Sequence, residues 1–263
     1  YLDWSPVKGL TARVDYTLNY YNQFRYYAPT PNTLYNFKTD SYTAYSPVSA
    51  NAGIYNYTNT GYKTQLNGRL EYQTTFAKNH NINALFVYSE EYWYDRYQMG
   101  SRLDRIHPTL SELDAALPDT QTATGNSSTE GLQSYIGRVN YSAFNKYLLE
   151  MNFRCDGSSK FLSGSRFGFF PSASAGWRFT EENFISPFTH SWLSSGKLRV
   201  SYGGLGNNSG VGRYQQQEIL AQSNYIINGE AAKGFTYRQM VNRNLSWEST
   251  NVFNLGLDLG FLN

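Results

Sequence analysis

The sequence predicts an all-β protein, and more narrowly a segment of an antiparallel transmembrane β-barrel with long extracellular loops. Three observations favour this fold class. Apolar and polar residues alternate along several runs, as they do on a strand whose two faces meet different surroundings. The connections between these runs are alternately short and long. Aromatic residues make up 17% of the 263 residues, with 24 Tyr, and 22 Gly are available for turns.

The length of the alternating runs separates a membrane strand from an ordinary one. In the run from Tyr62 to Phe76, Leu66 and Leu70 share one parity, and Arg69 and Glu71 share the other. Several runs are too long for ordinary strands, which span about five or six residues, and a strand that crosses a membrane needs roughly nine to eleven. Eight strands are predicted, at residues 10–20, 62–76, 82–94, 134–141, 147–156, 170–179, 197–202 and 252–261.

The connections between the predicted strands alternate in length. Residues 77–80 and 144–146 are tight turns, and residues 181–196 form a moderate link. Long loops are expected at residues 27–61, 97–131 and 203–243, with a shorter one at 157–167. Short turns at one end of the strands and long loops at the other are typical of outer-membrane barrels.

Two other architectures share the alternation. A soluble sandwich would pack the apolar faces of two sheets together, so that Leu66, Leu149 and Leu257 would be buried. A barrel of eight strands closed on itself would have to pair every inward charge within a narrow core, whereas a wide barrel can solvate them. The many charges on the polar parity therefore favour part of a wide barrel.

Several function classes are excluded or disfavoured. The net charge of +2 gives no electrostatic case for nucleic-acid binding. One cysteine, Cys155, allows no internal disulfide or cysteine-rich zinc site, and the three histidines lack ligand spacing. No apolar run is long enough for a transmembrane helix. No nucleophile elbow, phosphate-binding loop or zinc-protease motif is present, so we expect no enzyme activity, no metal and no cofactor.

The run from Lys146 to Phe184, "KYLLEMNFRCDGSSKFLSGSRFGFFPSASAGWRFTEENF", resembles the barrel signature of SusC/RagA-type TonB-dependent outer-membrane transporters. Further similar runs are "GRVNY" (137–141), "KLRVSYGGLGN" (197–207) and "LSWESTNVFNLGLDLGFLN" (245–263). Cys155 departs from the family pattern, on the predicted lipid face. Trp177 and Phe179 are expected at the short-turn end, where an aromatic girdle meets the lipid headgroups.

The resemblance implies a barrel of about 22 strands with a plug inside it. Because residues 1–263 show eight strands and neither a plug nor a TonB box, the chain is expected to be a partial barrel domain. Its opening, "YLDWSPVKGL", has no leader and fits a mature product or a fragment. Side chains expected to face the lumen or the plug are Arg13, Arg69, Glu71, Glu150, Arg154, Asp156 and Arg178.

The function that the resemblance implies is nutrient import across the outer membrane of a Gram-negative bacterium of the Bacteroidetes type. The expected partners are a SusD-like surface lipoprotein, outer-membrane lipid, and TonB–ExbB–ExbD through an N-terminal region missing from this chain. The expected substrate is an oligosaccharide or a peptide. Two alternatives stay open: a passive outer-membrane barrel or adhesin, and a soluble carbohydrate-binding β-sandwich.

Two groups of residues are candidates for substrate contact. A Tyr-rich loop offers rings that could stack on sugars, and loop packing and contact with the lipoprotein are the simpler alternatives. A second group stands at the extracellular rim of the strand 82–94, on its polar parity. The candidates are Tyr42, Tyr45, Tyr55, Tyr57, Glu91, Trp93 and Asp95.

Overall fold

A computed structural model describes residues 1–29, 33–44, 53–107, 109–185, 187 and 193–261 of the protein. Within these ranges the chain is built from antiparallel β-strands, and its few helical segments are short 3-10 turns. No helix among the described residues has the length and apolar character needed to cross a membrane. The strands are β1 (Leu2–Val7), β2 (Leu10–Tyr27), β3 (Thr33–Asn36), β4 (Ser41–Ala44), β5 (Ile54–Phe76), β6 (His80–Arg102), β7 (Thr122–Ala143), β8 (Tyr147–Ser158), β9 (Phe167–Trp177), β10 (Leu193–Asn207), β11 (Leu220–Ile227), β12 (Glu230–Tyr237) and β13 (Glu248–Phe261).

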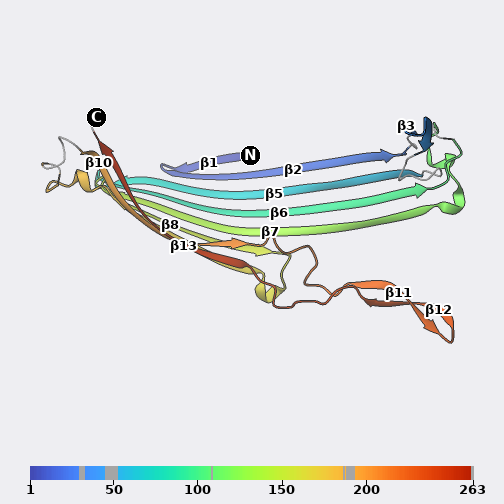
Figure 1. The fold of residues 1–263 in the computed structure, drawn as a ribbon. Helices are drawn as coiled ribbons and strands as arrows, with labels where there is room; N and C mark the ends of the chain where they lie inside the picture. The colour runs from blue at the N-terminus through green and yellow to red at the C-terminus, as the bar shows by residue number, and fades with distance from the viewer. Residues whose placement is uncertain (30–32, 45–52, 108, 186, 188–192, 262–263) are drawn as a thin grey trace. The chain divides into compact units, whose positions relative to one another are not determined.

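Nine of the strands form one sheet, in the order β1-β2-β5-β6-β7-β8-β9-β10-β13 (Figure 1). Each neighbour in this order is the next long strand along the chain, as in an up-and-down barrel wall. The hairpins β3-β4 and β11-β12 form separate two-stranded sheets. Because the order ends at β1 and β13, which are not paired with each other, the sheet is not closed, and an eight-stranded closed barrel is contradicted.

The ninth strand of the sheet, β1, was not predicted. Its six residues contain Pro6 and show little alternation. Proline lacks the N–H of a ladder bond, so it is confined to edges and irregular positions. The structure agrees, because β1 lies at the edge of the sheet and its register with β2 shifts between Trp4 and Val7.

Several strands also run further than predicted. β5 begins at Ile54 rather than Tyr62, β6 ends at Arg102 rather than Tyr94, and β7 begins at Thr122 rather than Ser134. These extensions carry mostly polar or small side chains on both parities, so the period-two contrast disappears, and in β5 Tyr and Thr still favour the strand. Conversely, β9 ends at Trp177, and Phe179 begins a 3-10 turn.

The alternation of short and long connections is confirmed. Residues 77–79 join β5 to β6, and residues 144–146 join β7 to β8. Ala77 and Lys78 both have positive φ, of 47° and 65°, and so do Phe144 and Asn145, of 51° and 56°. Two successive positive φ values give the backbone twist that suits a tight antiparallel hairpin. The long connections are residues 28–53, 103–121 and 208–247.

Contacts divide the chain into two units. The first unit comprises Tyr1–Thr17, Thr64–Tyr92 and Glu130–Asn263, and the second comprises Leu18–Lys63 and Trp93–Thr129. The first unit contains the short turns at residues 77–79 and 144–146, which are hydrogen-bonded to one another, from the Phe144 amide to the Asn79 carbonyl at 2.8 Å. The second unit contains the hairpin β3-β4 and the loop at residues 103–121.

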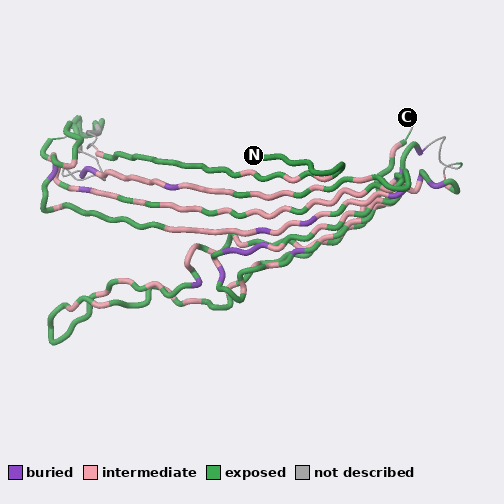
Figure 2. Tube along the Cα trace, turned by 180° about the vertical axis from the view of Figure 1, so that it is seen from behind, coloured by how far each residue is buried: buried purple, intermediate pink, exposed green. Residues whose placement is uncertain are grey.

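The apolar face of the sheet has no protein layer over it. Leu66, Leu149 and Leu257 are 39%, 36% and 57% exposed, so the soluble sandwich is contradicted. In Figure 2 the long strands are coloured mostly as exposed or intermediate, with few buried stretches. A soluble monomer rarely leaves so extensive an apolar surface uncovered. A face of this kind suits lipid, and the fold class predicted from the sequence, a transmembrane β-barrel segment, is confirmed.

We expect an arginine to be tolerated on the polar face of β13 and not on its apolar face. Leu255→Arg places a charge at the middle of the apolar row and is expected to destabilise the membrane-inserted protein by about 2 to 4 kcal/mol. Asn254→Arg, the matched change one residue away on the polar face, is expected to cost far less. The folded fraction in outer membranes, followed by heat-dependent gel migration, measures both. Equal losses for the two variants would contradict the assignment of the faces.

Candidate functional site

The charges on the polar face of the first unit are mostly paired with one another. Arg69 donates to Glu71 at 2.6 Å, and Arg154 donates to Asp156 at 2.5 Å. In each pair the two residues lie two positions apart on one strand and therefore share a face. Arg13 forms a bidentate pair with Asp3 of the unpredicted strand β1, at 2.6 and 2.7 Å. These exposed and half-exposed pairs neutralise the face and leave it polar.

Amides connect these pairs across neighbouring strands. The Asn67 amide donates to Asp15 at 2.7 Å and accepts from Ser89 at 2.7 Å. Asn83 donates to the second oxygen of Glu71 at 3.2 Å. Cross-strand pairs of this kind fix the register of a sheet face that carries no apolar core.

A hollow of about 700 Å³ with a mixed polar and apolar lining lies in the first unit. Glu150, one of the predicted residues, lines it together with Lys197 and Arg199 and with several amides and hydroxyls. Arg199 is paired with Asp258 at 3.2 Å, and Glu150 accepts from Asn152 at 2.8 Å. A concavity lined in this way can hydrogen-bond water, a polar polymer or another protein segment.

Arg178 occupies a different position from the other predicted charges. It lies just past the end of β9, and its guanidinium donates to the carbonyl and the side-chain oxygen of Asn145, at 3.3 and 2.9 Å. It also lines a second hollow, of about 360 Å³, with Lys197 and Asp258. Arg178 therefore belongs to the short-turn end of the first unit, and its predicted lumen or plug contact stays a prediction.

In the second unit, four tyrosine rings form a continuous band. Tyr27 of β2 lies 5.9 Å from Tyr55, Tyr55 lies 6.4 Å from Tyr57 with nearly parallel rings, and Tyr57 lies 6.3 Å from Tyr97 of β6. Tyr55 and Tyr57 were predicted as loop residues, but they stand on β5, two positions apart. Tyr27 and Tyr97 were missed, because only the sheet brings three distant segments together. Rings at this spacing offer a flat stacking surface.

Two further side-chain contacts of the second unit are made on the same strand face as this tyrosine band. Lys63 places its ammonium 4.7 Å from the centre of the Trp93 ring, a cation–π contact. The Tyr21 hydroxyl of β2 donates to Asp95 of β6 at 2.5 Å. These strands are not adjacent, and β5 passes between them.

Gly61 is the residue of β5 over which Tyr21 reaches Asp95. A Cβ at Gly61 would lie 2.7 Å from the Tyr21 ring and 2.5 Å from the Tyr94 carbonyl oxygen. Only a residue without a side chain permits this crossing. Gly61 thus fixes the orientation of the predicted carboxylate of Asp95.

The remaining substrate candidates are Tyr42, Tyr45 and Glu91. Tyr42 belongs to the hairpin β3-β4, where its ring lies 5.1 Å from Tyr35. Tyr45 lies outside the described residues. Glu91 is half-buried on β6 and belongs to the first unit. The structure therefore brings together Tyr55 and Tyr57, and it orients Trp93 and Asp95.

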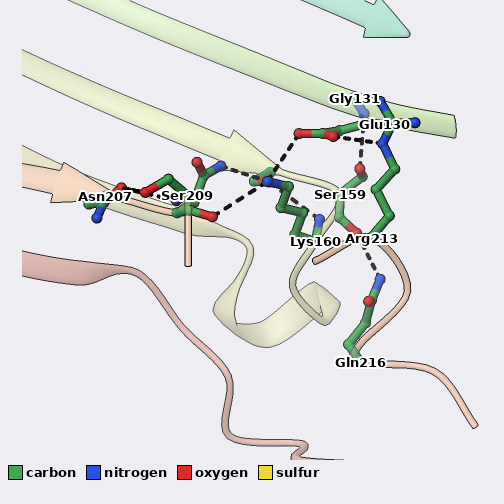
Figure 3. Close-up of polar contacts among 10 residues, drawn as sticks. Glu130, Gly131, Ser159, Lys160, Asn207, Ser209, Arg213 and Gln216 are labelled. Carbon is green, nitrogen blue, oxygen red and sulfur yellow. Dashed lines mark hydrogen bonds and ion pairs between the residues drawn. The ribbon is translucent and has the colours of Figure 1, made fainter. Parts of the chain in front are cut away.

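At the long-loop end of the first unit, a carboxylate holds two cations (Figure 3). Glu130 of β7 pairs with Lys160 at 3.4 Å and accepts from Arg213 at 2.8 Å. Gln216 adds a hydrogen bond to the Ser159 carbonyl at 2.8 Å. These contacts fasten the start of the long 208–247 connection to β7 and to the residues that follow β8.

An aromatic cluster in the same unit gathers the family motifs. Trp247 lies 5.4 Å from Phe161 and 5.6 Å from Phe170, and its indole N–H donates to the Arg166 carbonyl at 2.9 Å. Phe161 is 1% exposed and Phe170 is 8% exposed. These residues come from "DGSSKF", "GFFPS" and "LSWES", three motifs separated in sequence, so the cluster explains why the motifs occur together.

At the short-turn end, where β8 begins and β9 ends, the carboxylate of Glu182 connects several side chains. Glu182 is 9% exposed. Its carboxylate accepts from the Tyr147 hydroxyl at 2.6 Å and from the Trp177 indole at 3.1 Å, and it pairs with Lys146 at 3.3 Å. The hydrogen bond from Tyr147, followed by that from Trp177, holds the pKa of the Glu182 carboxyl below its ordinary value. We call these four residues the Glu182 cluster.

Among the described residues, no group of three or more His, Cys, Asp or Glu side chains is placed to hold a metal ion.

The crossing at Gly61 gives a direct test of the geometry in the second unit. Gly61→Ala is expected to displace Tyr21 and to destabilise the folded protein by about 1 to 3 kcal/mol, the usual cost of overpacking. Gly68→Ala is the matched control on the same strand, where an added Cβ meets nothing within 4 Å. Unfolding of the two variants in a denaturant series measures the difference. A Gly61→Ala protein as stable as the control would contradict the crossing.

The Glu182 cluster should make the short-turn end sensitive to acid. A lowered pKa means that Glu182 stabilises the fold fully above its unfolded value, near 4.5, and that this contribution is lost as the pH falls through the folded pKa. Glu182→Gln should therefore lower the thermal midpoint at neutral pH, and the gap to the natural protein should close in acid. Glu181→Gln, a change at an exposed neighbour, is the control. A gap that stays constant with pH would contradict the arrangement.

Comparisons with known proteins agree with the resemblance. The chain is 35% identical over 233 residues to the TonB-dependent receptor SusC of Bacteroides thetaiotaomicron, covering 84% of the chain and 22% of the receptor. It is 28% identical to the TonB-dependent receptor P26 of Formosa agariphila, covering all of the chain and 26% of that receptor. No family model matches.

Solved structures show the same fold. The structure of the RagAB peptide transporter matches with a TM-score of 0.82 and 23% identity, over 99% of this chain and 27% of the matched chain. A closed state of the RagAB importer matches with a TM-score of 0.83. The chain thus spans about a quarter of the length of the proteins it matches. Its motifs, strand order and relatives agree, and the chain carries part of the β-barrel of a SusC/RagA-type TonB-dependent transporter.

Proposed function

We propose that this chain forms part of the wall of an outer-membrane nutrient importer driven through TonB. The observation that carries the proposal is the contrast between the two faces of the sheet. One face exposes rows of Leu, Phe and Tyr, and the other carries paired charges and amides. A wall with lipid on one side and a hydrated bore on the other needs this arrangement.

The polar face then lines the bore. Arg13, Arg69 and Glu71 would meet water or a plug, together with Glu150, Arg154 and Asp156. Since most of these charges have a partner within the sheet, the wall needs no counter-charge from the contents of the bore. The plug and the TonB-contacting segment would lie in parts of the transporter other than residues 1–263.

Substrate contact is proposed for the second unit. The band of Tyr27, Tyr55, Tyr57 and Tyr97 would stack on sugar rings or on the flat groups of a peptide. Trp93 and Asp95 would supply a further ring and an acceptor. Tyr42, Tyr45 and Glu91 remain candidates outside the band. RagAB is a peptide transporter by name, which supports a peptide as the proposed substrate, and the stacking rings support an oligosaccharide as the other candidate.

The proposed partners follow from the same relatives. A SusD-like lipoprotein would cover the extracellular loops, and TonB–ExbB–ExbD would supply energy. The proposed location is the outer membrane of a Gram-negative bacterium. The relatives are transporters and receptors by name, which supports a protein without enzyme activity. No observed feature favours a passive barrel or adhesin.

Two tyrosines on opposite faces of β5 provide the test. Tyr57→Ala, in the full-length transporter, removes a ring of the band and should raise the half-saturating substrate concentration by roughly tenfold, the worth of one aromatic contact. Tyr62→Ala removes a ring that stacks on Tyr94, at 5.4 Å, on the other parity of the same strand. It should leave uptake per folded transporter unchanged.

The measurement is growth and uptake in a deletion strain that carries each variant, on single oligosaccharides and on a peptide digest. Uptake should also vanish when TonB is absent. Uptake that survives the loss of TonB would contradict the import mechanism. Equal effects of the two tyrosine changes would contradict the role of the band.

A further inference from the structure

An apolar groove of about 390 Å³ lies on the apolar face of the first unit, along β9. Ala175 forms its floor, because this short side chain stands between the bulkier Leu149 of β8 and Val200 of β10, its register partners on either side. Leu198 and Trp177 continue the walls. The small residues of "PSASAG" therefore leave a furrow between two apolar rows.

One end of the groove has fixed aromatic walls. Tyr147 and Trp177 line it, and both direct their polar atoms to the carboxylate of Glu182. Tyr141 lines it as well, and a hydrogen bond of 2.7 Å joins its hydroxyl to His80. These rings are held by the protein, so the groove exists before any ligand enters it.

Both signs of charge stand next to this end. Lys146 and Glu182 form an ion pair of 3.3 Å, and Glu182 accepts hydrogen bonds from Tyr147 and Trp177, which line the groove. A rim with this balance complements a zwitterionic headgroup, whose phosphate and ammonium need partners of opposite sign.

We propose that the groove holds one acyl chain of a phospholipid, with the headgroup at the Tyr147–Trp177 end. The inference rests on the proposed membrane location and goes beyond transport. The short-turn end of an outer-membrane barrel faces the periplasm, where the membrane leaflet is made of phospholipid rather than lipopolysaccharide. The occupant is therefore a phospholipid.

Packing, not the hydrophobic effect, selects this lipid. An acyl chain in the bilayer is already surrounded by hydrocarbon, so moving it into the groove removes no apolar surface from water. It gains close contacts with the walls around Ala175, which a flat protein surface does not offer. The headgroup contacts then add to this gain, so one lipid stays bound longer than its neighbours.

Filling the floor of the groove tests the proposal. Ala175→Leu, in the full-length transporter, puts a side chain where the acyl chain would lie. Gly68→Leu is the matched control, since Gly68 shares the apolar parity of β5 with Leu66, and an added Cβ meets nothing within 4 Å. Each protein is extracted into detergent with added palmitoyl-oleoyl phosphatidylethanolamine, and the bound lipid is counted by native mass spectrometry.

The natural protein and Gly68→Leu should each retain one phospholipid, and Ala175→Leu should lose it by roughly fivefold or more. Equal retention by all three proteins, equal loss by both variants, or a lipopolysaccharide adduct in place of the phospholipid would overturn the proposal. Heat-dependent gel migration of the same outer-membrane samples reports insertion separately. A protein absent from the outer membrane would contradict the proposed function, whereas an inserted protein without the retained lipid contradicts this inference alone.

Discussion

The structure depends on a sheet whose backbone hydrogen bonds are satisfied between strands while one face has no protein packed against it. Within lipid, an unpaired N–H or C=O group costs several kcal/mol, so continuous ladders of antiparallel strands are required. The ladders of β8 with β7 and β9, and of β10 with β13, run along almost the whole of the shorter strand, and β9 pairs with β10 over Ser172–Trp177. The apolar side chains then need only be compatible with lipid. The specific side-chain contacts are made on the polar face and at the strand ends.

Close packing within this single-layered sheet depends on aromatic rings that pack over glycines of the neighbouring strand. At Gly137, an added Cβ would lie 2.0 Å from the ring of Phe153, its register partner on β8. Gly61 admits Tyr21 in the second unit in the same way. In each case a large ring covers the backbone of a glycine on the neighbouring strand, where no side chain obstructs it. A layer without a hydrophobic core thereby gains cross-strand contacts that hold its register.

The sequence was sufficient to assign side chains to the two faces of the sheet, but it was not sufficient to locate where the strands begin and end. Leu66, Leu149 and Leu257 could be placed on the apolar face because alternation depends only on strand geometry, which is local. Alternation fades in β5 before Tyr62, where tyrosine, threonine and asparagine occupy both parities, so Tyr55 and Tyr57 were taken as loop residues. β1 was missed because Pro6 argues against a strand in the sequence, and a strand that contains proline is tolerated only at the edge of a sheet.

The candidate sites were predictable in part, for the same reason. Trp93 and Asp95 were assigned to one face by counting parity from Ile82, which requires one strand alone. Their contacts with Lys63 and Tyr21 depend on the register between strands, which no local pattern encodes. The tyrosine band needs three segments in register, so Tyr27 and Tyr97 had no signal in the sequence. Tyrosines on a shared parity of neighbouring strands would have been the only hint.

The motif "GFFPSASAGWR" becomes intelligible once its residues are divided among three tasks. Phe170 enters the aromatic cluster with Trp247 at the long-loop end, and Trp177 enters the Glu182 cluster at the short-turn end. Each cluster joins segments that are distant in sequence, so each needs large rings at fixed positions. Between them the strand crosses the apolar face, where a larger side chain at Ala175 would fill the groove beside Leu149 and Val200. Large side chains at both ends of the strand and small ones in its middle are therefore separate requirements. The two clusters of the protein require the large rings, and the acyl chain requires the small residues between them.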